Sequence, residues 1–198
     1  TCNTCHTTDP RAGFDKETKK YDTRVSEFGI TCESCHGPGK AHVDFQRGQA
    51  RLRPADRTTT GDPIVNPATL DNRKSAQVCG ACHVTHRRVD PQGRFTNYLP
   101  GQDYDQARKP LRMTEEFMES VLEGATNKAE LRKDYQKQFL SQFWPDGTIR
   151  IAGREYNGFI ESACHTRGEM SCVSCHSLHQ PGSDRRPVKE WADDQLQS

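Results

Sequence analysis

The sequence is poor in the large apolar side chains from which protein cores are built. Its 198 residues include 9 Leu, 5 Ile, 9 Val and 8 Phe, a share below the roughly 20% under which a chain is suspected of disorder. Disorder also requires a high net charge, whereas 28 basic and 27 acidic residues leave only +1. Something other than aliphatic side chains must therefore fill the interior of a folded chain.

The sequence also lacks a basic surplus and long apolar runs. Without a basic surplus, nucleic acid is not expected as a partner. No apolar run approaches the roughly 20 residues that span a bilayer, and no charged leader precedes an apolar segment. The first cysteine motif starts at the second residue, so we interpret the chain as a mature or trimmed product. A signal peptide that has been removed is compatible with this interpretation.

Cysteine and histidine are numerous in the chain, with nine cysteines and eight histidines. The pattern Cys-x-x-Cys-His occurs four times and is the attachment motif of c-type haem. Its two thiols can bond to the two vinyl-derived carbons on one edge of the porphyrin, and the following imidazole then reaches the iron. The attaching cysteines are Cys2, Cys5, Cys32, Cys35, Cys79, Cys82, Cys172 and Cys175, and the proximal ligands are His6, His36, His83 and His176.

Paired cysteines of this spacing also form zinc sites and thiol–disulfide redox centres. Neither requires a histidine directly after the second cysteine, and four such histidines by chance would be on the order of a few in a million. A disulfide framework leaves the histidines unexplained as well. Four haems would also supply the missing apolar interior. We therefore expect a mainly α, loop-rich fold with little β structure, whose core is formed largely by haems.

Four histidines remain once the proximal ligands are assigned: His42, His86, His165 and His179. A haem iron has two axial positions, so four spare imidazoles match the four remaining positions. This match predicts predominantly bis-histidine ligation. The alternative for each residue is an ordinary surface or hydrogen-bonding histidine.

Chain reach limits which haem two of these histidines can serve. His86 lies three residues after His83, and His179 lies three after His176. Three residues extend at most about 10 Å, too little to pass around the ring edge to its opposite face. His86 and His179 must therefore bind haems other than the ones attached just before them.

His42 is less constrained, because it lies six residues after His36, about 20 Å when fully extended. The intervening Gly-Pro-Gly at 37–39 favours a turn, so we expect His42 to serve a different haem as well. Such ligands would join neighbouring haems. The methionines Met113, Met118 and Met170 could also be axial ligands, but the histidines already suffice.

Cys164 is the ninth cysteine and stands in Glu-Ser-Ala-Cys-His, a motif without its first cysteine. A fifth haem held there by one thioether is the minor alternative, and we favour a buried thiol. A fifth haem would make His165 a proximal ligand and leave two irons open to substrate. Whether Cys164 holds a haem therefore distinguishes an electron carrier from a redox enzyme.

The segments between motifs carry weaker patterns. Residues 47–65 are expected to form a loop, whose arginines either pair with haem propionates or are solvated. Asn66-Pro67 looks like an N-cap followed by proline at the first helical position, with a short helix toward Cys79. The arginines of the expected loop at 47–65 are Arg47, Arg51, Arg53 and Arg57.

We expect one tetrahaem domain over residues 1–198, with haem-binding segments at 1–90 and 161–180 and a helical insert at about 100–160. Apolar stripes predict two helices there, a turn at 144–147 follows the second, and 148–156 alternates weakly like a small hairpin. The polar tail from 181 is expected at the surface. The stripe residues are Met113, Phe117 and Val121, then Leu131, Tyr135, Phe139 and Phe143 with Leu140 on the same side.

The segments GITCESCHGPGKAHV, CGACH, FWPDGT and ESACHTRGEMSCVSCHSLH resemble multihaem c-type cytochromes related to the tetrahaem electron acceptor of ammonia oxidation, and the larger octahaem cytochromes. The resemblance covers most of the chain. It implies a mostly helical fold around closely packed haems, electron transfer as the role, and His42 and His179 as distal ligands. Some relatives keep one five-coordinate haem. Tetrahaem extracellular filaments are also similar in motif density, whereas the reaction-centre tetrahaem subunit, with its methionine ligands, is a poorer match.

These patterns together predict an electron carrier with four haem c groups rather than an enzyme. The alternatives are a redox enzyme acting on a small nitrogen or sulfur species at an open iron, and a subunit of an extracellular cytochrome filament. Redox proteins are the expected partners, with a homo-oligomer as a further option. Because haem is attached covalently outside the cytoplasm, we expect a periplasmic or extracellular location.

Overall fold

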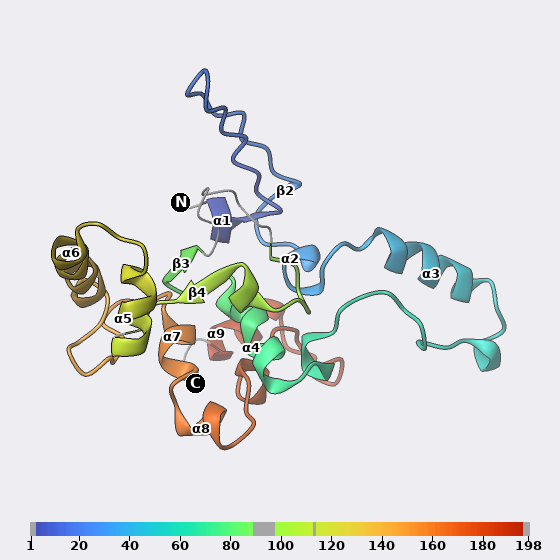
Figure 1. Ribbon diagram of the computed structural model, residues 1–198. Coiled ribbons are helices and arrows are strands. Elements are labelled where there is room, and N and C mark those ends of the chain that lie inside the picture. The colour runs from blue at the N-terminus through green and yellow to red at the C-terminus, as the bar shows by residue number, and fades with distance from the viewer. Residues whose placement is uncertain (1–2, 89–97, 113, 196–198) are drawn as a thin grey trace.

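The computed structural model describes residues 3–88, 98–112 and 114–195, and within them helices predominate, as predicted. Loops connect most of the elements (Figure 1). The helices are α1 (Asn3–His6), α2 (Cys32–His36), α3 (Lys40–Ala50), α4 (Asn72–Gly80), α5 (Glu115–Leu122), α6 (Lys128–Leu140), α7 (Glu155–Phe159), α8 (Ala163–Thr166) and α9 (Val188–Gln195). Short 3₁₀ turns cover Pro54–Asp56, Pro67–Thr69, Tyr104–Gln106 and Cys172–Ser174.

Two short antiparallel ladders hold the strands of the described residues. β1 (Thr7–Thr8) pairs with β2 (Glu27–Phe28), and the chain between them forms an extended arm that projects from the body (Figure 1). β3 (His86–Arg88) pairs with β4 (Arg108–Pro110) near the centre of the molecule. The second ladder therefore fixes the chain directly after the third motif.

A conventional hydrophobic core lies between α5 and α6, as the apolar stripes predict. It contains Phe117 and Val121 from the first stripe and Tyr135 and Phe139 from the second. Leu140 is an exception, because it is 40% exposed and lies outside this core. Met118 is also part of the core and is 3% exposed, so its thioether packs against protein.

A second cluster surrounds the third and fourth motifs. Its buried members are Ala76, Val84, Tyr104, Tyr156 and Ile160, with Cys172 packed beside them. It joins α4, which ends inside the third motif, to α7 and to the 3₁₀ turn that opens the fourth motif. Two Cys-x-x-Cys-His motifs that are far apart in sequence are thereby brought together.

The side chain of Asn157 ties α7 to the chain after the third motif. Its Nδ2 donates to the carbonyl oxygens of Thr85 (2.9 Å) and Leu111 (3.2 Å), and its Oδ1 accepts from the Thr85 N–H (2.8 Å). Because Asn157 is only 5% exposed, these bonds satisfy polar groups that water does not reach.

The predicted hairpin at 148–156 is wrong. The predicted turn at 144–147 is present, and one isolated bridge joins Phe143 to Ile149 across it. Gly153 then adopts a positive φ of 79°, and its N–H donates to the Glu155 carboxylate. The chain therefore turns into α7 instead of returning as a strand.

Two further boundaries differ from the predictions. Residues 47–50 belong to α3 rather than to a loop. Arg47, Gln49 and Ala50 are good helix formers, and they outweigh Gly48. Asn66 caps as predicted and accepts from the Ala68 N–H, but only a 3₁₀ turn follows. The helix toward Cys79 begins at a second cap, where Asp71 accepts from the Lys74 N–H at 2.8 Å.

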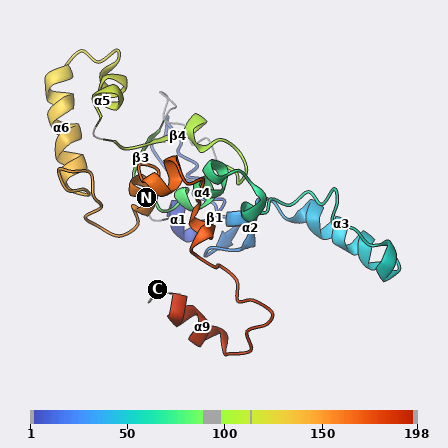
Figure 2. The same cartoon turned by 90° about the horizontal axis from the view of Figure 1, so that it is seen from below.

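The chain after the fourth motif leads to α9, which projects from the body (Figure 2). This helix was not predicted, although the exposed position of the polar tail was. Within the described residues, none of the helices combines the length and the apolar character needed to cross a membrane.

Candidate haem-binding site

The described motifs form helical turns. α1 ends at His6, α2 covers the second motif, and α4 runs into the third. In the third and fourth motifs, the histidine N–H donates to the carbonyl of the first cysteine, at 3.0 Å from His83 and 2.9 Å from His176. Residues three apart on a helical turn lie on one face, so the two thiols of a motif can reach one porphyrin edge.

Thiols of different motifs converge. Cys79 is hydrogen-bonded to Cys172, which raises the pKa of Cys79 and lowers the pKa of Cys172. The Cys5 Sγ lies 3.6 Å from the carbonyl oxygen of Cys82. Burial and the nearby charge of Cys79 raise the pKa of Cys35, and Cys35 in turn contributes to the raised pKa of Cys82. Attachment points from all four motifs therefore meet in one region. No disulfide is formed among the described cysteines, and no three of the described His, Cys, Asp and Glu side chains gather as a metal-ion cluster.

Four of the predicted axial histidines have their Nδ1 atom bound to an acceptor. The partners are the Val65 carbonyl for His36 (2.7 Å), the Met170 carbonyl for His165 (3.0 Å), Asp62 for His42 (2.7 Å) and Glu155 for His83 (2.8 Å). Carbonyl and carboxylate oxygens can only accept, so Nδ1 carries the proton and the lone pair of a neutral ring is on Nε2. Metal-bound histidines are held in this way.

The rings of His36 and His179 lie close together and nearly parallel, at a spacing that matches two ligands of one iron. Their ring centroids are 6.1 Å apart, and their planes differ by 21°. A metal–nitrogen bond of about 2 Å places each ring centre about 3 Å from the metal, so two imidazoles across one iron are about 6 Å apart. This is the pairing that the reach argument allows, because His179 meets a motif other than its own.

The remaining predicted residues are placed as follows. His86 lies in β3 with its ring edge-on to Tyr104, at 6.2 Å between centroids, and His165 lies against Phe159 at 5.0 Å. His6, Cys32, Cys175 and His176 are exposed, and Cys2 lies outside the described residues. Cys164 is exposed, not buried as expected, because the one-turn helix α8 directs His165 inward and leaves the thiol outside.

A cavity of about 470 Å³ lies beside the first and third motifs and is lined by Cys5, Cys82 and Arg108. Arg108 is only 7% exposed, and its guanidinium lies 5.8 Å from the centre of the Tyr104 ring. Sequence reasoning missed this residue. The sequence pointed instead to the arginines of 47–57, either as propionate partners or as a solvated run; of these, Arg53 pairs with Asp56 and Arg57 binds backbone carbonyls nearby.

The comparisons with known proteins agree with the motifs. Residues 1–37 match the family model of cytochrome c554 and c-prime. The crystal structure of the outer cell wall cytochrome OcwA is similar over 92% of this chain, with 23% identity and a TM-score of 0.49. This chain spans about a third of that protein, 34% of its length. None of the curated proteins compared matches the chain. Over residues 1–37, the chain thus resembles a c-type cytochrome family.

Proposed function

We propose that this chain is an electron-transfer protein that binds four c-type haems through the four Cys-x-x-Cys-His motifs, with predominantly bis-histidine ligation. The observation that carries the proposal is the pairing of His36 and His179 at 6.1 Å, the spacing of two imidazoles on one iron. Haem iron supplies one-electron oxidation and reduction when bound, and two imidazoles favour a lower potential than a methionine–histidine pair.

The side chains around the motifs support this assignment. Ile30 is 62% exposed and Leu178 is 56% exposed, although both stand next to motif residues. Apolar groups at such places are suited to packing on a porphyrin face. The conventional core, by contrast, lies mainly in the α5–α6 region, which matches the expectation that haems fill the rest.

We further propose a periplasmic or extracellular location and redox proteins as partners. Covalent haem attachment takes place outside the cytoplasm, so the motifs imply export of the chain. The role proposed for the protein residues is to attach, orient and shield the cofactors. It calls for no acid–base residue.

The proposed function is tested by counting haems in the purified protein. The expected result is a mass increase of four haems that survives denaturation, together with the absorption of thioether-bound haem after reduction. The ferric spectrum should be low-spin. Zinc in place of haem, or cofactor lost on denaturation, would contradict haem attachment. A high-spin component that binds cyanide rapidly would favour the redox enzyme.

Arg108 is expected to pair with a haem propionate, because a buried guanidinium in a cavity beside two attaching cysteines offers the bidentate donor that carboxylates prefer. Arg108→Gln should shift one haem potential downward, since a positive charge near the ring stabilises the reduced state. Spectroelectrochemical titration measures this. Arg47→Gln, on the exposed part of α3, is the control and should leave all potentials unchanged. Equal titrations for the two variants would refute the role of Arg108.

A further inference from the structure

The four histidines with bound Nδ1 atoms fall into two classes. His36 and His165 donate to backbone carbonyls, those of Val65 and Met170. His42 and His83 donate to carboxylates. The acceptor is neutral in the first class and ionisable in the second, and each class contains one motif histidine and one histidine outside the motifs.

The carboxylate partner of His42 is firmly held. Both oxygens of Asp62 lie within hydrogen-bonding distance of Nδ1, at 2.7 and 2.9 Å, and Gln46 donates to the same carboxylate at 2.7 Å. The Asp62 side chain is 11% exposed.

The partner of His83 is similar in chemistry but more open to solvent. Glu155 accepts from Nδ1 at 2.8 Å through one oxygen, and its other oxygen accepts from the Gly153 N–H at 2.9 Å. The two bonds fix the carboxylate at the start of α7. The His83 and Glu155 side chains are 59% and 56% exposed. We therefore expect a weaker effect here than at Asp62.

We propose that Asp62 and Glu155 are positioning residues that lower the reduction potentials of the irons bound by His42 and His83, relative to the irons whose ligands donate to carbonyls. The inference rests on the proposed function, because it requires haem on these histidines. It divides the cofactors into a low-potential and a high-potential class through two side chains that lie outside the attachment motifs.

The physical reason is the charge on the acceptor. A carboxylate draws the Nδ1 proton more strongly than a carbonyl does, which makes the imidazole a better electron donor at Nε2. A more basic ligand stabilises the ferric state over the ferrous state and so lowers the potential. Hydrogen bonds to the groups that hold the iron are one means by which a protein tunes its potential.

The test uses Asp62→Asn and Glu155→Gln in the haem-loaded full chain. Each change removes the charge and keeps an oxygen acceptor of the same shape. In a spectroelectrochemical titration, Asp62→Asn should favour reduction of one haem by about tenfold in the equilibrium constant. The midpoint potential of that haem should therefore rise by about 59 mV for one electron. Glu155→Gln should raise a transition by less. NMR should show a weaker Nδ1 hydrogen bond in each variant.

Two matched controls separate the hydrogen bond from the loss of charge. Asp44→Asn removes a carboxylate from α3, the helix of His42, where Asp44 pairs with Lys40. Glu161→Gln removes a carboxylate that pairs with Arg112. Both controls should titrate like the parent protein.

The outcomes distinguish this inference from the proposed function. Absence of covalent haem in the parent protein would end both. Four haems with unchanged potentials in Asp62→Asn and Glu155→Gln would overturn the inference alone, and shifts of equal size in the controls would do the same. If Asp62→Asn loses haem, the Glu155→Gln titration decides. A new high-spin component in either variant would support the positioning role.

Discussion

Replacing His179 by glycine is expected to convert one of the four proposed haem irons from low spin to high spin. His179 is the partner that the structure places 6.1 Å from His36, and removing it would leave that iron with one protein ligand. Absorption and EPR spectra of the ferric protein measure the change. Added imidazole should restore the low-spin form, because it can occupy the position that the side chain has left.

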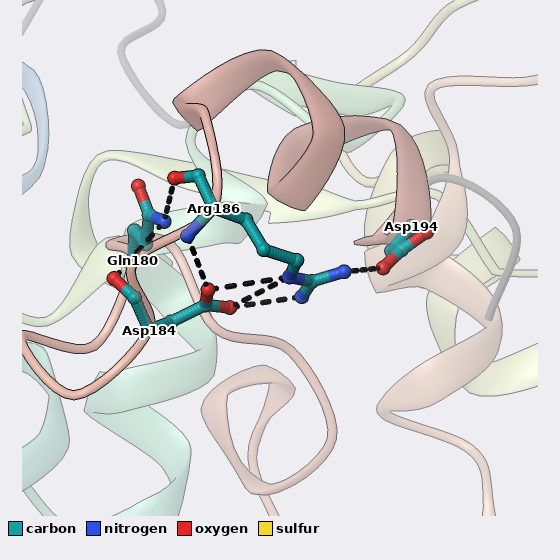
Figure 3. A network of polar contacts seen from close by, with 4 residues as sticks. All are labelled: Gln180, Asp184, Arg186 and Asp194. Carbon is teal, nitrogen blue, oxygen red and sulfur yellow. Dashed lines mark hydrogen bonds and ion pairs between the residues drawn. The ribbon is translucent and has the colours of Figure 1, made fainter.

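Gln180→Ala provides the neighbouring control. Gln180 donates to the carbonyl oxygens of Asp184 (3.3 Å) and Arg186 (2.7 Å), and Arg186 also pairs with Asp184 and Asp194 (Figure 3). This network connects the segment after the fourth motif to α9. Loosening it should leave the iron low-spin, because no proposed ligand is changed.

A second variant separates ligation from folding. His179→Met retains a possible ligand, and methionine in this position raises the potential. We expect a low-spin protein with one transition at a higher potential. A parent-like spectrum in His179→Gly, with four haems still attached, would show that His179 is not an axial ligand.

The attachment motifs and the helical stripes could be predicted because both are local patterns. The four Cys-x-x-Cys-His motifs can be recognised from residue spacing alone, and the apolar stripes of α5 and α6 follow helical periodicity. The reach argument extends this to one tertiary relation. Three residues cannot carry His179 around its own haem, so the prediction is a partner from another motif, and the ring of His36 lies 6.1 Å away.

The groups that orient the ligands could not be predicted. Glu155 lies 72 residues from His83, and Asp62 lies 20 residues from His42. Backbone carbonyls such as that of Val65 carry no sequence pattern at all. Arg108 was missed for a related reason, since its burial is created by the β3–β4 ladder and not by its neighbours in sequence.

The errors in the fold have equally local causes. The alternation at 148–156 is typical of a strand, but one glycine with positive φ at Gly153 redirects the chain into α7. The stretch 47–65 was interpreted as a loop because it is rich in Arg, Thr and Pro, although its first four residues extend α3 to Ala50. Local propensity favoured the helix, and charge alone does not exclude one.

Gly80→Ala is expected to destabilise the haem-loaded protein, although alanine is normally the better helix residue. A Cβ atom at Gly80 would lie 2.7–2.8 Å from three ring carbons of Tyr156. The Tyr156 ring is 3% exposed and lies against Tyr104, at 6.2 Å between centroids, so it has little room to move. Overpacking of this kind costs about 1–3 kcal/mol, which exceeds the gain of up to about 1 kcal/mol from helix propensity.

Gly48→Ala is the matched control, because Gly48 also lies in a helix, α3, and a Cβ atom there would meet nothing within 4 Å. This variant should gain up to about 1 kcal/mol. The thermal midpoint of the haem-loaded protein should therefore fall in Gly80→Ala and rise in Gly48→Ala, by about 2–4 °C for each kcal/mol. An equal rise of the thermal midpoint in both variants would show that the Tyr156 ring can move to make room for the added methyl group. A loss confined to Gly80→Ala would mean that the third motif needs glycine between its cysteines because α7 packs directly against it.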